Sequence, residues 1–164
     1  MILAPLSPLV YLLRAEIDAY GGLLAAFERQ QELILKREID EANEVARSIE
    51  KIAQEASHRR EAREGWVEDF ASSHAQSSTA RVQELLPYFP EEQRPLFEAL
   101  IKEINHLIRR VRRRAQQNHG LLARAVEFHR ELLERFHPSA RPRTYAPSGQ
   151  VAPLLTASGL RAHG

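Results

Sequence analysis

The chain has 164 residues, with 43% hydrophobic and 27% charged residues, so its length allows one domain and its composition excludes a fully disordered protein. A formal net charge of +1 excludes a protein that binds polyanions through its overall charge. The absence of cysteine excludes disulfides, cysteine-ligated zinc, iron–sulfur clusters and thiol catalysis.

The first residues do not predict a targeting or membrane segment. Residues 1–13 are apolar, but Pro5 and Pro8 interrupt them, and Arg14 follows the apolar run instead of preceding it. A signal peptide has the opposite order of charge and apolar run. No stretch reaches the about 20 apolar residues that a membrane-spanning helix needs. We therefore expect a cytoplasmic protein without membrane insertion.

Proline positions delimit two long helical regions. All nine prolines lie in three zones, residues 5–8, 87–95 and 138–153. Because proline breaks the interior of a helix, the runs 9–86 and 96–137 are where long helices can form. Apolar residues recur in both runs at spacings of three and four, and neither shows sustained strand-like alternation. The expected fold class is all-α.

The first run is too long for a single helix of a compact protein. Its apolar seam changes phase near residues 36–40, so we expect one helix at about 8–36 and another at about 39–73. Either Glu38 or Asp40 can place a carboxylate at the positive end of the second helix.

Two glycines, Gly21 and Gly22, lie in the middle of the first predicted helix. Each should cost about 1 kcal/mol relative to alanine, and a kink at this point is an alternative to a straight helix.

On the second helix, Trp66 and Phe70 are expected in the core or at the end of the bundle.

A loop at 74–79 and a short helix at 80–86 should precede the third long helix. Pro90 suits the first position of that helix, and Glu91 and Glu92 suit the positive end of its dipole. A helix over 90–136 would be about 70 Å long and must lie along other long helices. We therefore expect an elongated antiparallel three-helix bundle, with Asn118 setting the register as a polar residue in the seam.

The C-terminal segment differs from the body of the chain. Residues 138–164 contain three arginines and no acidic residue, and they are rich in proline, alanine, serine and glycine. We expect a helical bundle at 1–137 and a flexible tail at 138–164. The tail also contains Tyr145, Val151, Leu154, Leu155 and Leu160. These apolar residues could form a short motif that becomes ordered on a partner, or they could be part of a frayed terminus without a role.

No catalytic or metal-binding pattern is present in the sequence. None of the seven histidines lies three or four residues from another, and there is no glycine-rich phosphate loop or nucleophile motif. We expect neither an enzyme nor a bound cofactor or metal.

The segment Arg109–Arg114 contains five arginines in six positions. On a helix, Arg109, Arg112 and Arg113 share one flank, and Arg110 and Arg114 share another. These side chains could lie in solvent or against the acidic second helix, or they could bind phosphates or an acidic partner.

Several local features together resemble the FlgN family of flagellar export chaperones. The segment Glu84–Pro87 runs into Pro90-Glu91-Glu92, in the place where the family has Leu-Leu and then Pro-Glu-Glu. Asn118 is followed by Leu121-Leu122, and the tail contains Thr144 to Gln150, similar to the family's Thr-Tyr-Gly-x-x-Gly-Gln with Ala146 in place of the first glycine. The resemblance covers nearly the whole chain.

The resemblance implies a non-enzymatic chaperone of the cytosol. Such proteins bind the hook–filament junction proteins of the flagellum, keep them unassembled and deliver them to the type III export apparatus. The implied cargo-binding residues are Leu121, Leu122, Val126, Phe128, Leu132, Leu133 and Phe136. Tyr145, Gly149 and Gln150 would dock to the cytoplasmic domain of the export gate.

Two other functions remain open at this point. A helical protein could bind nucleic acid through Arg109–Arg114 and the basic tail, although the near-neutral charge makes nucleic acid the less favoured partner. The other alternative is a structural coiled coil that only self-associates. A homo-oligomer is also compatible with the chaperone hypothesis.

Overall fold

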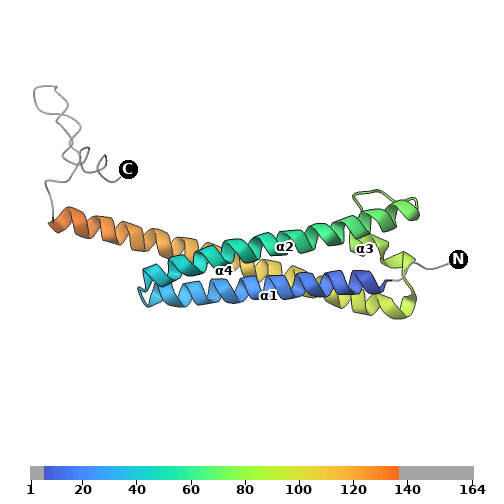
Figure 1. Cartoon of the computed structure of the whole chain (residues 1–164), viewed down its shortest axis with the longest axis horizontal. Helices are drawn as coiled ribbons and strands as arrows, with labels where there is room; N and C mark the ends of the chain where they lie inside the picture. The colour runs from blue at the N-terminus through green and yellow to red at the C-terminus, as the bar shows by residue number, and fades with distance from the viewer. Residues whose placement is uncertain (1–5, 137–164) are drawn as a thin grey trace, which may run out of the picture. The chain divides into compact units, whose positions relative to one another are not determined.

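The structure, a computed structural model, describes residues 6–136 (Figure 1). Within this range it contains four α-helices and two 3-10 turns and no strand, which confirms the all-α class. Their bounds are α1 Ser7–Leu35, α2 Ile39–Ser73, α3 Val82–Leu85, η1 Leu86–Tyr88, η2 Glu91–Gln93 and α4 Arg94–Phe136. The predicted domain boundary at residue 137 and the tail lie outside the described residues.

Helices α1 and α2 form an antiparallel hairpin and lie side by side in Figure 1. The chain reverses at Arg37, which adopts a positive φ of 63°. The Arg37 amide donates to the Ile34 carbonyl and the Glu38 amide donates to the Leu33 carbonyl. This pair of bonds satisfies the last carbonyls of α1, so the helix ends close to where the seam changes phase.

Small residues of α2 allow the hairpin to pack closely. Ala42, Ala56 and Ala71 are at most 3% exposed, and Ala42, Ile49 and Ala56 recur at intervals of seven. α1 continues without a break through Gly21 and Gly22. The first helix is therefore not broken at these glycines.

The segment between α2 and α4 differs in detail from the sequence prediction. The short helix expected at 80–86 is only α3, and it continues into the 3-10 turn η1. Pro90 precedes the 3-10 turn η2 instead of opening the long helix, which begins at Arg94. The Arg94 guanidinium donates to the carbonyl oxygens of Phe89 at 3.0 Å and Pro87 at 3.1 Å, and so holds the preceding turns against the start of α4.

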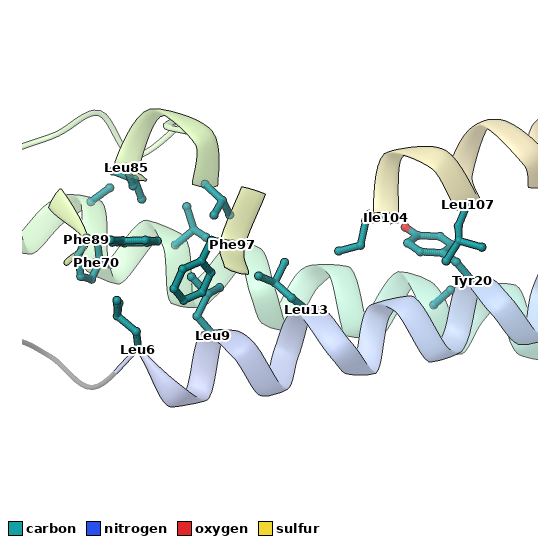
Figure 2. Close-up of a cluster of buried hydrophobic side chains, with 14 of the residues drawn as sticks. Leu6, Leu9, Leu13, Tyr20, Phe70, Leu85, Phe89, Phe97, Ile104 and Leu107 are labelled. Atoms are coloured by element: carbon teal, nitrogen blue, oxygen red, sulfur yellow. The ribbon is translucent and has the colours of Figure 1, made fainter. Parts of the chain in front are cut away.

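Aromatic residues close the core at this end. Phe70 stacks on Trp66 at 5.1 Å and meets Phe89 edge-on at 5.4 Å, while Phe89 lies 4.8 Å from Phe97. Phe89 and Phe97 are at most 2% exposed. Figure 2 shows Phe97 directed towards Leu9 of α1 in the same cluster. The expectation that Trp66 and Phe70 lie in the core or at its end is confirmed.

The chain divides into two compact units, Met1–His119 and Gly120–Gly164. We call them the N-terminal and C-terminal units. The N-terminal unit holds the hairpin, α3 and the first part of α4, whose Phe97, Ile104 and Leu107 join the buried cluster of α1 and α2. The described part of the C-terminal unit is the remainder of α4. The finer prediction of an elongated three-helix bundle along the whole third helix is not confirmed.

Candidate functional site

The helix of the C-terminal unit presents an exposed apolar face. Val126 is 69% exposed, Phe128 52%, Leu133 55% and Phe136 76%. Of the described residues past His119 none is buried, whereas Phe97, Ile104, Leu107 and Asn118 are buried in the preceding part of α4. Large apolar side chains gathered in this way on one surface are typical of an interaction site.

All seven predicted cargo-binding residues lie on this face. At 100° per residue they fall within an arc of roughly 160° on the helical wheel. Leu121, Leu122 and Leu132 are half-buried, and the other four are exposed. The rest of the wheel is occupied mainly by charged residues, which are Arg124, Glu127, Arg130, Glu131, Glu134 and Arg135. We define the seven residues as the apolar face.

Charges on the opposite side of this helix are paired along the chain. Arg130 donates to Glu127 at 2.6 and 3.2 Å and to Glu134 at 2.8 Å. The hydrogen bond from Arg130, together with its charge, holds the pKa of the Glu127 carboxyl below its usual value. Glu–Arg pairs at spacings of three and four support a helix that has no buried residues of its own.

Asn118 is the last buried residue before the apolar face. It is 1% exposed, and its Nδ2 donates to the Phe27 carbonyl at 2.8 Å and to Gln30 Oε1 at 3.0 Å. The sequence singled out Asn118 as a register-setting residue, and the structure provides its polar partner on α1. The Oδ1 of Asn118 is buried and has no hydrogen-bond partner among the described residues. The two bonds that Nδ2 donates favour one register, because a misaligned helix would leave this buried donor unpaired as well.

The arginine segment is divided as the helical wheel predicted, but its acidic partner is a different one. Arg110 and Arg114 approach Glu28 of α1 at 3.6 and 3.5 Å, and Arg114 also donates to Gln31. Of the possibilities left open by the sequence, contact with the acidic second helix is not the one found for these two arginines. Glu28 follows Phe27 on α1, so it can reach the helix whose Asn118 contacts the Phe27 carbonyl.

Sequence reasoning missed a buried ion pair in the hairpin. Glu16 of α1 has no exposed side-chain surface, and Arg63 of α2 donates to it at 2.6 and 3.2 Å. The signal was present, because Glu16 lies seven residues from both Leu9 and Leu23, and Arg63 seven from both Ala56 and Phe70. The pair joins α1 to α2 within the N-terminal unit.

Nothing in the described residues points to a metal or a membrane. Between residues 6 and 136, no three histidine or acidic side chains are grouped so that they could hold a metal ion. Over the same range, no helix is both long and apolar enough to cross a membrane. The predicted gate-docking residues Tyr145, Gly149 and Gln150 lie outside the described residues.

Comparison with known proteins gives one result. A search among curated proteins and a search among solved structures returned no match. The family model described as FlgN protein matches residues 6–153, which include α1 to α4 and the segment with Tyr145. The match extends over nearly the whole sequence, and the chain therefore belongs to the FlgN family.

Proposed function

We propose that this protein is a cytoplasmic export chaperone that binds hook–filament junction proteins of the flagellum through its apolar face. Binding would cover surfaces with which these subunits otherwise assemble, and the complex would then pass to the flagellar type III export apparatus. Membership of the FlgN family supports the chaperone role in general. The cargo and the delivery step are the finer part of the proposal.

The observation that carries the proposal is the exposure of the apolar face. Water around Val126, Phe128, Leu133 and Phe136 would be released when an apolar partner covers these side chains. An amphipathic helix of the cargo can pack on such a face by contacts three and four residues apart. No catalytic step is needed, because binding alone protects the cargo.

Docking to the export gate is assigned to the tail. The residues that correspond to the family pattern are Tyr145, Gly149 and Gln150, and the family match includes them. A tyrosine combines an apolar ring with a hydroxyl group and is common where one protein binds another. Deletion of 138–164 should therefore leave cargo binding intact and abolish binding to the cytoplasmic domain of the gate.

The central experiment places a charge in the apolar face. Leu132→Asp and Phe136→Asp should each abolish co-purification of junction proteins, because an unpaired carboxylate would be buried under the cargo. Ala123→Asp is the matched control, since Ala123 is exposed on the opposite side of the same helix. Circular dichroism should show the same helicity in all three variants. Full cargo recovery with both face variants would refute the proposal.

The nucleic-acid alternative is less well supported by the contacts of the arginine segment. Arg110 and Arg114 are engaged with Glu28, while Arg109, Arg112 and Arg113 are exposed. This alternative predicts binding to duplex DNA that weakens steeply with salt and disappears when the three exposed arginines become glutamine. Under the chaperone proposal, the same substitutions leave cargo binding unchanged.

A further inference from the structure

Two hollows adjoin on the N-terminal unit, where residues of α3 and η1 come together with α4. The first has a volume of about 320 Å³ and is lined mainly by residues of α2, α3 and α4. The second has a volume of about 520 Å³ and is lined by residues of α3, η1 and α4. Gln83 and Asn105 line both, so the two hollows are parts of one groove. We call it the α3–α4 groove.

The floor of the α3–α4 groove is apolar. Leu13, Val82 and Ile104 line the first hollow and are buried. Ile101 in the same hollow and Leu86 in the second are half-buried, so part of each side chain remains in contact with water. A ligand with apolar side chains would gain free energy by covering this surface.

Unpaired positive charge surrounds the groove. The basic residues that line it are Arg63, Arg81, Lys102 and Arg109, and the acidic ones are Glu64 and Glu98. Arg63 is paired with Glu16, and Glu64 lies 3.7 Å from Arg60. Within residues 6–136, no ion pair joins Arg81, Lys102 or Arg109 to a carboxylate. Glu98 therefore opposes three unpaired cations, and the groove attracts acidic groups.

The composition of the groove fits a peptide from another protein better than a nucleic acid or the chain's own tail. Gln83 and Asn105 are exposed, and each side-chain amide can both donate to and accept from a peptide backbone. No aromatic side chain lines either hollow, so bases would have no ring to stack on. The tail is unsuited by charge, because residues 138–164 contain three arginines and no acidic residue.

We propose that the α3–α4 groove binds a peptide segment of a partner protein in which acidic residues are interspersed with apolar ones. The apolar side chains cover Leu86 and Ile101, and the carboxylates accept charge-assisted hydrogen bonds from Arg81, Lys102 and Arg109. Lys102 and Arg109 are about 10 Å apart along α4, a length that three or four residues of an extended peptide span. The groove belongs to the N-terminal unit, so this inference does not rest on the proposed use of the apolar face.

The test uses the full chain and two synthetic peptides. The probe is Glu-Leu-Glu-Glu-Leu-Glu, acetylated and amidated at its ends, and its control has glutamine in place of every glutamate. In two-dimensional NMR spectra, the acidic peptide should shift the amide signals of 81–86 and 98–109 in a saturable way. The glutamine peptide should leave these signals nearly unchanged, because it carries no charge.

Two matched double variants separate the groove from general attraction to a basic helix. Lys102→Gln with Arg109→Gln removes charges that line the groove, and Arg112→Gln with Arg113→Gln removes the same number of exposed charges that do not. The first should weaken binding of the acidic peptide by about tenfold or more. The second should weaken it by less than about threefold at physiological ionic strength, because salt screens charges outside the site.

Several outcomes would overturn the inference. Equal weakening in both double variants would mean that the helix as a whole attracts the peptide. Displacement of the peptide by single-stranded DNA of equal negative charge, at a lower concentration than unlabelled peptide requires, would make nucleic acid the ligand. A homodimer that the first variant disperses, or absence of saturable binding, would equally overturn it. None of these outcomes bears on the apolar face, which Leu132→Asp and Phe136→Asp test separately.

Discussion

At the scale of single residues, the buried pair Glu16–Arg63 has the largest expected effect on stability. Burial lowers the pKa of Arg63, but the hydrogen bond and the charge of Glu16 outweigh this, so the net direction is upward. A buried charge without its partner retains its desolvation cost. The pair should therefore matter mainly when one member is removed.

Glu16→Ala should lower the free energy of unfolding by about 3–5 kcal/mol, because Arg63 would lose its buried partner. The double variant Glu16→Leu, Arg63→Leu should lie close to the unchanged protein, since neither charge remains. Urea denaturation followed by circular dichroism measures both. A double variant as unstable as the single one would mean that the ion pair itself is strongly stabilising.

Tyr20 gives a prediction for alkaline pH. Burial and, after it, the negative charge of nearby Glu16 raise the pKa of Tyr20 above 10.0. Since the folded protein binds this proton more tightly than the unfolded chain, the stabilisation is complete below the unfolded pKa. It is lost as the pH rises through the folded pKa.

Urea midpoints should therefore fall as the pH rises from the unfolded pKa of about 10 through the raised folded pKa, and Tyr20→Phe should reduce this fall. The comparison with Tyr11→Phe controls for loss of a hydroxyl, because Tyr11 is 67% exposed. Equal slopes in Tyr20→Phe and in the unchanged protein would contradict the prediction.

At the scale of elements, α1 is less stable than its length suggests, because two glycines lie in its interior. A Cβ atom added at Gly21 or at Gly22 meets no heavy atom within 4 Å. Neither position has a positive φ. Neither a close approach nor a special backbone conformation thus requires glycine there.

Gly21→Ala and Gly22→Ala should each raise the free energy of unfolding by about 0.5–1 kcal/mol, because alanine loses less conformational freedom in a helix. The reverse substitution, alanine to glycine, is favourable at Ala75. Its φ is 52°, so glycine would relieve backbone strain there. Ala75→Gly should therefore also stabilise the protein. Thermal unfolding checks all three variants, and a loss of stability in Ala75→Gly would contradict the strain argument.

Polar residues in the helical seams explain how the elements find their register. On α1, Leu9, Glu16, Leu23 and Gln30 recur at intervals of seven. Glu16 meets Arg63 on α2, and Gln30 meets Asn118 on α4. A shift by one turn would bury these groups without partners, so the two contacts favour one alignment of each helix against α1.

At the scale of the whole molecule, stability is divided unevenly between the two units. The buried side chains of α4 all belong to the N-terminal unit. Among residues 6–136, the ion pairs of the segment 120–136 are local ones along the helix, such as Glu127–Arg130. Isolated helices of about this length are marginally stable in water.

Amide hydrogen exchange along α4 should therefore show strong protection up to about Asn118 and much weaker protection over 121–136. Addition of a junction protein should raise protection in 121–136 and leave residues 97–118 nearly unchanged. Uniform protection along the free helix would show that the segment has a stabilising partner within the molecule.

The sequence by itself determined the helical class, the ends of the long helices to within a few residues, and the apolar positions of the last segment. These features follow from local rules, because proline placement and the spacing of apolar residues act over one or two helical turns. The resemblance to the FlgN family likewise rested on short motifs, and the family match covers them.

Only the tertiary structure decided which polar residues are paired and which apolar residues remain uncovered. Glu16 and Arg63 are 47 residues apart, and Asn118 and Gln30 are 88 apart, so no local rule joins them. Leu107 and Phe128 are both apolar residues of α4, yet Leu107 is 7% exposed and Phe128 is 52% exposed. The spacing of apolar residues places both side chains on an apolar face of the helix. Each is buried only where another element lies against that face.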